Sequence, residues 1–217
     1  MYAMQCTRPD ICFAVGIVAR YQANPGQAHW TAVKHILKYL KRTKEYALVY
    51  QSHDLTPVGY VDADYQGDKD KRRSTTGYVF MFGGGAIVWR SVKQKCNSLS
   101  TMEAEYVAAC EAAKEAVWLR NFLAEIDVIP SLPKCITIYC DNEAAIMNTK
   151  DSRCHQSMKH IDGKYHYIRS VVKHGDVALL HIAGVDNLAD PFTKSLPGAV
   201  FNKHVEDLGV RDLPILN

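Results

Sequence analysis

Residues 1 to about 55 follow a helical spacing of hydrophobic positions. A first helix is predicted to start at Thr7-Arg8-Pro9-Asp10, where the proline and the early acid favour a first turn, and to reach Tyr21. After the break at Asn24-Pro25-Gly26, a second helix is predicted from about His29 to Arg42. Its hydrophobic face consists of Trp30, Val33, Ile36, Leu37 and Leu40. Two helices of this size cannot bury a core alone, so we expect them to belong to a larger body.

After residue 55 the pattern becomes that of short strands alternating with helices. Three strands are predicted over 58–65, 76–82 and 86–90, with three glycines as the tight turn between the last two. A capping box, Ser100 to Glu103, begins a long helix that reaches about Glu125. The remaining predicted elements are strands over 135–140 and 177–182 and helices over 142–148, 158–174 and 186–196. This order predicts an α/β fold in which helices flank a mixed five-stranded sheet.

Composition adds a division of charge to this picture. The chain has 217 residues, 47% hydrophobic and 23% charged, which is typical of a globular protein. Of its net charge of +3, residues 1–55 contribute seven Lys or Arg against three Asp or Glu, and the rest nineteen against twenty. The division fits a polyanionic partner for the first part and cation ligands for the second. No run approaches the ~18 apolar residues of a membrane span, and no signal-peptide pattern follows Met1, so no membrane partner is expected.

The seven cysteines are odd in number and form no CxxC pair, which favours reduced thiols in a cytosolic setting. Cys135, Cys140, Cys154 and His155 are an alternative zinc site, but their spacing fits no usual zinc finger. Buried thiols are therefore the default interpretation.

Four acids stand at positions suited to metal chemistry. Asp62 lies in the first strand, Glu105 in the first turns of the long helix, Asp141 at the end of the fourth strand and Asp190 in the last helix. Carboxylates from separate elements can surround two divalent cations, which activate water and stabilise the leaving oxygen of a phosphodiester. Acids at the ends of elements also cap helices, so the spacing alone leaves both interpretations open.

Five ordered motifs carry a family resemblance. They are V-D-A-D-Y-Q-G-D with R-R-S-T-T-G-Y-V-F, S-L-S-T-M-E-A-E-Y-V-A-A, I-Y-C-D-N-E-A-A-I, K-H-I-D-G-K-Y-H-Y-I-R and D-N-L-A-D-P-F-T-K. The motifs resemble the ribonuclease H domain of Ty1/copia-type retrotransposon Pol polyproteins, in the plant Tnt-like lineage. The N-terminal T-R-P-D-I-C-F-A-V, with N-P-G-Q-A-H-W-T-A-V-K-H-I-L-K-Y-L-K-R-T, resembles the segment that joins the reverse transcriptase to that domain. The resemblance covers nearly the whole chain.

The resemblance implies three parts. Residues 1–55 correspond to the helical C-terminal end of the reverse transcriptase and connection segment. Residues 56–198 correspond to the ribonuclease H-like domain, whose sheet is an antiparallel meander followed by two parallel strands. Residues 199–217 are left as a C-terminal tail.

The resemblance also implies an activity, Mg²⁺-dependent hydrolysis of the RNA strand of RNA–DNA hybrids. Matched motif by motif, the catalytic and metal-binding set is Asp62, Glu105, Asp141 and Asp190, holding two Mg²⁺ ions, for which Mn²⁺ can substitute. The implied partners are the hybrid and the reverse transcriptase domain of the same polyprotein. The implied location is cytoplasmic, in a retrotransposon particle if the element is active, with access to the nucleus. The alternative is a truncated, inactive Pol relic that folds and binds nucleic acid without cleaving it.

Other acids have simpler interpretations. Asp64 shares a strand face with Asp62 but not its place in the motif, so we interpret it as a neighbouring or surface acid. Glu103 fits the capping box. Asp68 and Asp70, in the polar turn, are expected to be solvated, and Asp186 is a candidate cap of the last helix.

Two further sequence patterns, one with a histidine and one with a tyrosine and two acids, do not lead to a site assignment. Many cellular ribonucleases H carry a histidine in the loop before the final acid, whereas this chain has none there, and His181 lies in the preceding strand. Tyr60 with Asp62 and Asp64 superficially resembles the Y-x-D-D of polymerase palms, but these acids are not adjacent, and sixty residues cannot build fingers and palm.

Nucleic-acid contacts are predicted from basic residues in two places. The first is the turn after the first strand, and the second is the polar stripe of the helix over 158–174. The candidates are Arg72, Arg73, Ser74, Lys159, His160, His166 and Arg169. A merely solvated turn and helix face remain the alternative. Contacts of this kind would recognise the shape of the hybrid and its 2′-OH groups, so little sequence preference is expected.

Overall fold

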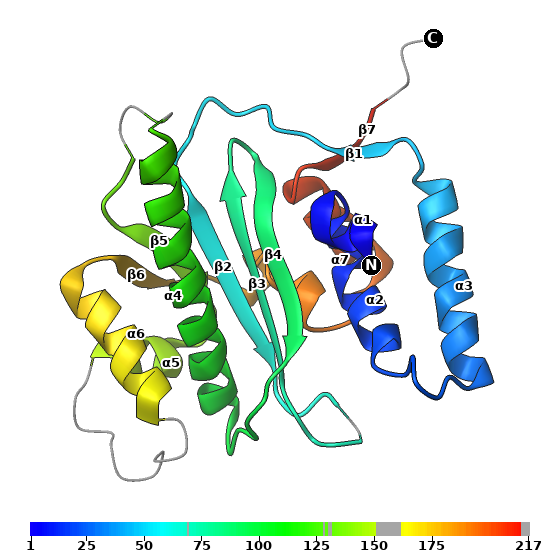
Figure 1. Ribbon diagram of the computed structural model, residues 1–217, viewed down its shortest axis with the longest axis horizontal. Coiled ribbons are helices and arrows are strands. Elements are labelled where there is room, and N and C mark those ends of the chain that lie inside the picture. Colours follow the sequence, from blue (N-terminus) through cyan, green and yellow to red (C-terminus); the bar gives the residue numbers. More distant parts are fainter. Residues whose placement is uncertain (69, 128, 130–131, 151–161, 214–217) are drawn as a thin grey trace.

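The computed structural model describes residues 1–213 except 69, 128, 130, 131 and 151–161. At its centre is a five-stranded sheet in the order β4-β3-β2-β5-β6 (Figure 1). Its strands are β2 (Val58–Asp64), β3 (Thr75–Phe82), β4 (Gly85–Lys93), β5 (Ile136–Cys140) and β6 (Val177–His181). Strands β2 to β4 are antiparallel neighbours, β5 is parallel to β2, and β6 is parallel to β5. The predicted α/β fold with a mixed five-stranded sheet is therefore confirmed.

Helix α4 (Thr101–Ile126) crosses one face of this sheet (Figure 1). It begins at Ser100, whose hydroxyl accepts a hydrogen bond from the Glu103 N–H at 3.1 Å, while Glu103 Oε2 accepts one from the Leu99 N–H at 2.8 Å. The predicted capping interaction is thus present, with the acid bonding one residue earlier than in the usual box. Small side chains let the helix lie close to the strands, and the buried ones are Ala104, Ala108, Ala109, Ala112, Ala113 and Ala116.

Helices α5 (Glu143–Lys150) and α6 (Asp162–His174) pack against α4. Their hydrophobic side chains join the main core, where Ile146 and Ile168 meet the strand residues Ile136 and Ile138. The predicted start of the second helix, at residues 158–161, lies outside the described residues.

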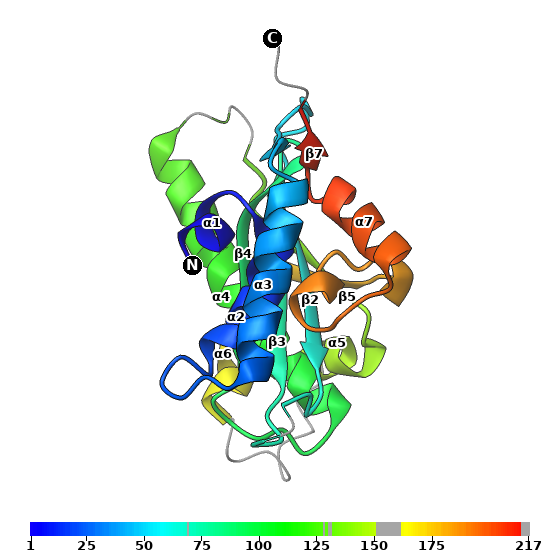
Figure 2. The same ribbon diagram turned by 90° about the vertical axis from the view of Figure 1, so that its right-hand side faces the viewer.

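The opposite face of the sheet is covered by the C-terminal segment (Figure 2). The prediction of a single helix over 186–196 is wrong. The segment instead forms two short 3₁₀ turns, η3 (Gly184–Asp186) and η4 (Asp190–Phe192). Asn187 accounts for the interruption: its side chain accepts a hydrogen bond from the Ala189 N–H and donates one to the Val61 carbonyl, which competes with helical bonding. Phe192 then packs with Val79 in a second core cluster.

Residues 198–212 form structure that the sequence pattern did not indicate. Helix α7 (Gly198–Asp207) leads to strand β7 (Val210–Asp212), which pairs antiparallel with β1 (Tyr46–Leu48). Leu208 and Val210 are buried. The division of the chain at residues 55 and 198 stays a prediction, but the last segment packs on the body of the protein.

The N-terminal segment lies beside the edge strand β4 (Figure 1). It consists of α1 (Tyr2–Cys6), η1 (Pro9–Ile11), α2 (Cys12–Ala19) and α3 (Gln27–Arg42). The two predicted helices correspond to α2 and α3. A buried network ties α3 to the start of the chain, because Asp10 accepts hydrogen bonds from Arg8 (2.7 Å) and from the Tyr39 hydroxyl (2.7 Å).

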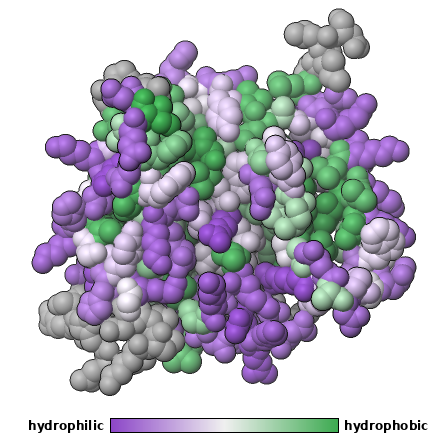
Figure 3. Space-filling model, in the orientation of Figure 1, coloured by the Kyte–Doolittle hydropathy of each residue, from purple (hydrophilic) through white to green (hydrophobic). Residues whose placement is uncertain are grey.

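Hydrophobic surface remains exposed between α2 and α3 (Figure 3). An apolar groove there is lined by Val15, Val18, Val33, Ile36, Leu37 and Leu40. The hydrophobic face predicted for the second helix is thus only partly covered. Within the described residues, no helix has the length and apolar composition that crossing a membrane would require.

Candidate active site

Four carboxylates from four separate elements meet at one end of the central strands. Strands β2 and β5 run parallel with Val61 opposite Cys140, so Asp62 near the end of β2 lies beside Asp141, which directly follows β5. Glu105 reaches this edge from α4, and Asp190 from η4 on the other face of the sheet. Oxygen atoms of Asp62, Asp141 and Asp190 all lie within 4.8 Å of one another. Glu105 and Asp141 form an adjoining group with the Cys140 thiol at the same spacing.

Most of this acid cluster, defined as Asp62, Glu105, Asp141 and Asp190, is buried. Asp62, Glu105 and Asp190 are 2%, 6% and 7% exposed. Burial raises the pKa of Glu105 to about 9, and the negative charges of Asp62 and Asp141 add to the rise. Burial raises the pKa of Asp190 to about 6, and burial together with Asp62 raises that of Asp141. The cluster therefore resists carrying its full negative charge without a cation.

One oxygen of Glu105 is left without a hydrogen bond. Its Oε1 accepts one from the Ala63 N–H at 3.1 Å, whereas the buried Oε2 has no hydrogen-bond partner among the described residues. An unsatisfied carboxylate oxygen in a buried site is costly. Carboxylate oxygens are the ligands that hard divalent cations such as Mg²⁺ prefer. The residues present therefore fit a divalent metal, with Glu105 Oε2 as one open ligand.

Lys194 supplies a positive charge within the acid cluster. Its Nζ lies 2.9 Å from Asp190 Oδ1 and 3.7 Å from Asp62 Oδ2. Burial alone would lower the pKa of Lys194, but the charge of Asp62 and the contact with Asp190 raise it above its ordinary value. Thr193, its neighbour, donates a hydrogen bond to Asp62 Oδ2 and so orients that carboxylate. Sequence reasoning missed both residues, although the spacing of Asp190 and Lys194 by four, in the quoted motif, was a signal.

Cys140 adjoins the acids but is a poor ligand in its ordinary state. It is fully buried, and burial raises the pKa of its thiol well above the usual value, so the group stays protonated. Of the alternative zinc set, Cys135 is half-buried, and Cys154 and His155 lie outside the described residues. That interpretation stays untested.

The residues predicted to contact nucleic acid differ in their exposure and in their hydrogen bonds. Arg72 is exposed and Arg73 half-buried in the turn after β2. Ser74 is fully buried, and its hydroxyl accepts a hydrogen bond from the Gln66 N–H, so as placed it stabilises the turn. His166 is exposed on α6, and Arg169 Nε donates to the Asn148 carbonyl at 3.1 Å. Lys159 and His160 lie outside the described residues.

The acids of the turn differ from expectation in one case. Asp68 is not solvated: it is 7% exposed and ion-paired with Lys93, because the turn folds back over the end of β4. Asp70 accepts a hydrogen bond from the Tyr21 hydroxyl at 2.9 Å, and Asp64 is half-buried. Burial and the charge of Asp62 raise the pKa of Asp64.

The chain is similar in sequence to the Pol polyproteins of plant transposons. It is 48% identical over 210 residues, 97% of its length, to the Pol polyprotein of transposon TNT 1-94 from Nicotiana tabacum. It is 36% identical over 209 residues, 96% of its length, to the Pol polyprotein of transposon RE2 from Arabidopsis thaliana. The chain spans only 16% and 14% of these two relatives. No protein-family model matches it.

Among solved structures, the chain is similar to LC11-RNase H1 from compost. The two are 15% identical, with a TM-score of 0.48, over 70% of this chain and 99% of that one.

Fold and site together define the class: an α/β domain with a mixed five-stranded sheet, whose central strands present a carboxylate cluster suited to divalent metal. The chain belongs to the Pol polyproteins of Ty1/copia-type retrotransposons, in the plant lineage of the tobacco element, and corresponds to one segment of them.

Proposed function

We propose that this chain hydrolyses the RNA strand of RNA–DNA hybrids with Mg²⁺, as a step in the reverse transcription of a retrotransposon. The observation that supports it most is the convergence of four carboxylates with the unpartnered, buried Oε2 of Glu105. Such a site is stable in its charged form only with cations in it. We infer the hybrid as substrate from the resemblance of the motifs to the ribonuclease H domain of Pol polyproteins, to one of which the chain is 48% identical.

In this proposal Asp62, Glu105, Asp141 and Asp190 hold two Mg²⁺ ions. When bound, such a pair supplies an activated water and stabilises the leaving oxygen of the phosphodiester. The Thr193 hydroxyl and the Ala63 N–H hold one oxygen each of Asp62 and Glu105, which leaves Glu105 Oε2 open as a ligand. Lys194 balances the charge of Asp62 and Asp190 while metal is absent. The products carry 5′-phosphate and 3′-hydroxyl ends.

The partners and location follow from the same proposal. The protein binds the sugar–phosphate backbone of the hybrid. Of the predicted contact residues, the described part of the chain includes Arg72, Arg73, His166 and Arg169. The reverse transcriptase domain of the same polyprotein supplies the hybrid, in a cytoplasmic particle with access to the nucleus.

A second candidate is a chain that binds the hybrid without cleaving it. Lys194 is the observation that favours it, since an ammonium held by two of the four acids competes with metal for them. Binding without metal-dependent turnover would identify this alternative.

The test incubates the purified chain with a hybrid labelled on its RNA strand. Cleavage is expected with Mg²⁺, is expected to stop with EDTA, and is expected to be lost in Asp141→Asn. Asp186→Asn is the matched control, because Asp186 is an exposed acid of the neighbouring turn that pairs with Lys203 at 3.4 Å and lies outside the acid cluster. If the wild type does not cut the RNA, or if Asp141→Asn cuts it equally well, the proposal fails.

A further inference from the structure

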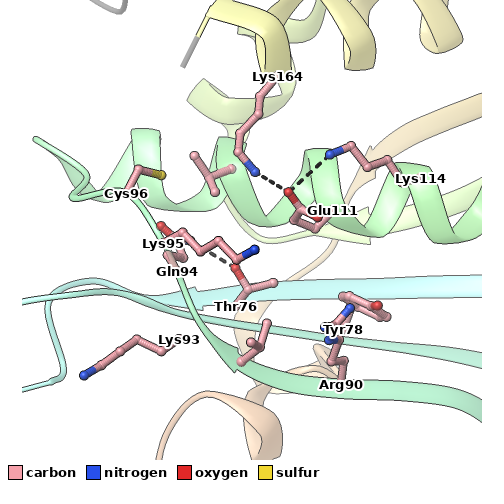
Figure 4. A pocket seen from close by; sticks show the side chains of 12 residues that line it. Thr76, Tyr78, Arg90, Lys93, Gln94, Lys95, Cys96, Glu111, Lys114 and Lys164 are labelled. Carbon is pink, nitrogen blue, oxygen red and sulfur yellow. Dashed lines mark hydrogen bonds and ion pairs between the residues drawn. The ribbon is translucent and has the colours of Figure 1, made fainter. Parts of the chain in front are cut away.

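A second charged site lies on the face of the sheet that α4 covers. A cavity of about 480 Å³ opens there between α4, the start of α6 and strands β3 and β4 (Figure 4). Five of its twelve lining residues are basic, namely Arg90, Lys93, Lys95, Lys114 and Lys164. Only Glu111 among the twelve is acidic. Lys93 is already ion-paired with Asp68, so the other four cations against Glu111 leave a net charge of +3.

Glu111 serves as the shared counter-ion of two of these cations. Lys164 from α6 and Lys114 from α4 both converge on its Oε1, Lys114 at 3.4 Å (Figure 4). Two ammonium groups held by one carboxylate repel each other, and that repulsion is relieved by further negative charge. One carboxylate thus serves both ammonium groups on this side of the cavity, while Glu115 of α4 accepts a hydrogen bond from the Tyr78 hydroxyl at 3.0 Å and adds a second negative charge near Arg90.

Arg90 and Lys95 add two cations from the strand side. Both are exposed, and they stand across the cavity from Lys114 and Lys164 (Figure 4). The planar guanidinium of arginine matches two oxygens of a phosphate at once, and lysine acts as a point charge beside it. An anion between the strand side and the helix side would meet cations from both.

The floor between them is fixed and neutral. Gln94 is buried, and its amide donates hydrogen bonds to Thr76 Oγ1 at 3.1 Å and to the Ala104 carbonyl at 2.9 Å. These polar groups are already used within the protein. The cations that line the cavity therefore determine which ligand binds, and they favour multiply charged oxyanions.

The cavity is separate from the acid cluster. Side chains alternate along β3, so Thr76 and Tyr78 face the cavity, whereas the position of Gly77 faces Thr193 and Phe192 beside Asp190. A ligand in the cavity would thus lie on the far side of β3 from Asp62 and Asp190, whereas Glu105 reaches the acid cluster from α4, the helix that also lines the cavity.

We propose that this cavity is a phosphate-binding site, independent of the metal chemistry of the acid cluster. The ligand is a phosphate group of two or more charges, from a free phosphorylated molecule or from a nucleic-acid backbone that passes over α4. Glu111 acts as the built-in anion that the ligand displaces from Lys114 and Lys164.

Calorimetric titration with inorganic pyrophosphate in EDTA tests the site without any metal at the acid cluster. The double variant Arg90→Gln, Lys95→Gln is expected to weaken binding by roughly tenfold or more, and Glu111→Gln to strengthen it by roughly fivefold because the competing anion is gone. Lys38→Gln, at an exposed lysine of α3, removes one positive charge elsewhere and is expected to change little. Circular dichroism checks that each variant folds. The same pyrophosphate affinity in all four proteins, or weaker binding in Glu111→Gln, overturns the proposal.

A second titration, with an uncut hybrid in EDTA at several salt concentrations, identifies the source of the phosphate. If the backbone supplies it, the double variant loses affinity, and the salt dependence falls by about two charges. If hybrid binding is unchanged while pyrophosphate binding is lost, the ligand is a free phosphorylated molecule. Neither result depends on cleavage, so failure of the hydrolysis assay leaves this test intact.

Discussion

The basic cavity lies on the face of the sheet that α4 covers, whereas Asp62 and Asp190 of the acid cluster meet on the other face, and each site contains one residue of the opposite sign. Lys194 stands among the four carboxylates, and Glu111 among the five cations. The difference between them is burial. Asp62, Glu105 and Asp190 are buried, whereas Arg90, Lys95 and Lys114 are exposed. Charge repulsion is strong where water is excluded and weak where water screens it, so the acid cluster depends on a cation far more than the cavity depends on an anion.

The largest expected effect is on stability without metal, through Glu105. Its pKa is raised from 4.5 to about 9, so between these values the folded state holds a proton that the unfolded state has lost. The free energy of unfolding in EDTA should therefore fall as the pH rises across this window, by up to about 1.4 kcal/mol per pH unit. Urea denaturation at several pH values measures the slope.

Two comparisons sharpen that prediction. Glu105→Gln cannot ionise and should flatten the slope, and saturating Mg²⁺ should offset it in the wild type. Glu111→Gln, the corresponding change in the basic cavity, should leave the slope as it is. A wild-type stability that is constant or rising from pH 5 to pH 9 in EDTA would show that the acids are not held together as described.

A methyl group added at Gly77 is expected to disturb the acid cluster without disturbing the basic cavity. A Cβ added there would lie 2.6 Å from Thr193 Cγ2 and 2.8 Å from Phe192 Cβ, which forces the segment that carries Asp190 to move. Gly77→Ala should cost about 1–3 kcal/mol of unfolding free energy and weaken metal binding. Pyrophosphate binding on the other face should survive in the folded protein.

The control for this change is Gly163→Ala in α6, where an added Cβ meets no atom of the described residues within 4 Å. It should be neutral or stabilise the protein by up to about 1 kcal/mol, because alanine loses less entropy in a helix. Equal stability of the two alanine variants in urea denaturation would contradict the close packing of β3 on residues 189–193.

Lys194 carries the smallest expected effect, since its side chain is 43% exposed and water screens its ion pairs. Lys194→Met removes the cation that competes with metal, so Mn²⁺ should bind more tightly, by roughly fivefold. Lys194→Arg keeps the charge and should behave as the wild type. Calorimetry with Mn²⁺ measures both, and an unchanged affinity in the methionine variant would remove Lys194 from the metal site.

The sheet followed from local patterns, whereas the set of four acids came from the resemblance of the motifs to a known family, because spacing alone left a capping role open. Strand alternation, the glycine turn and the cap at Ser100 each fix a short stretch of chain. The parallel pairing of β2 with β5 then brings Asp62 and Asp141 to the same edge. Their placement agrees with the set that the motifs indicated, while their roles stay predictions.

Contacts between distant segments were not predictable in this way. Strand β1 pairs with β7 over three residues each, too short a pattern to distinguish from a loop. The burial of Asp68 depends on Lys93, and the position of Lys194 depends on the turn that Asn187 imposes through the Val61 carbonyl. Each is set by side chains that meet only after folding.

Calorimetric titration of the metal-free chain with Mn²⁺ tests the central claim most directly, with Asp62→Asn and Glu111→Gln alongside. The acid cluster should bind Mn²⁺ in the wild type and in Glu111→Gln, and binding should be lost or greatly weakened in Asp62→Asn. Equal Mn²⁺ binding in the wild type and Asp62→Asn, or no binding in either, would contradict a metal centre at these carboxylates.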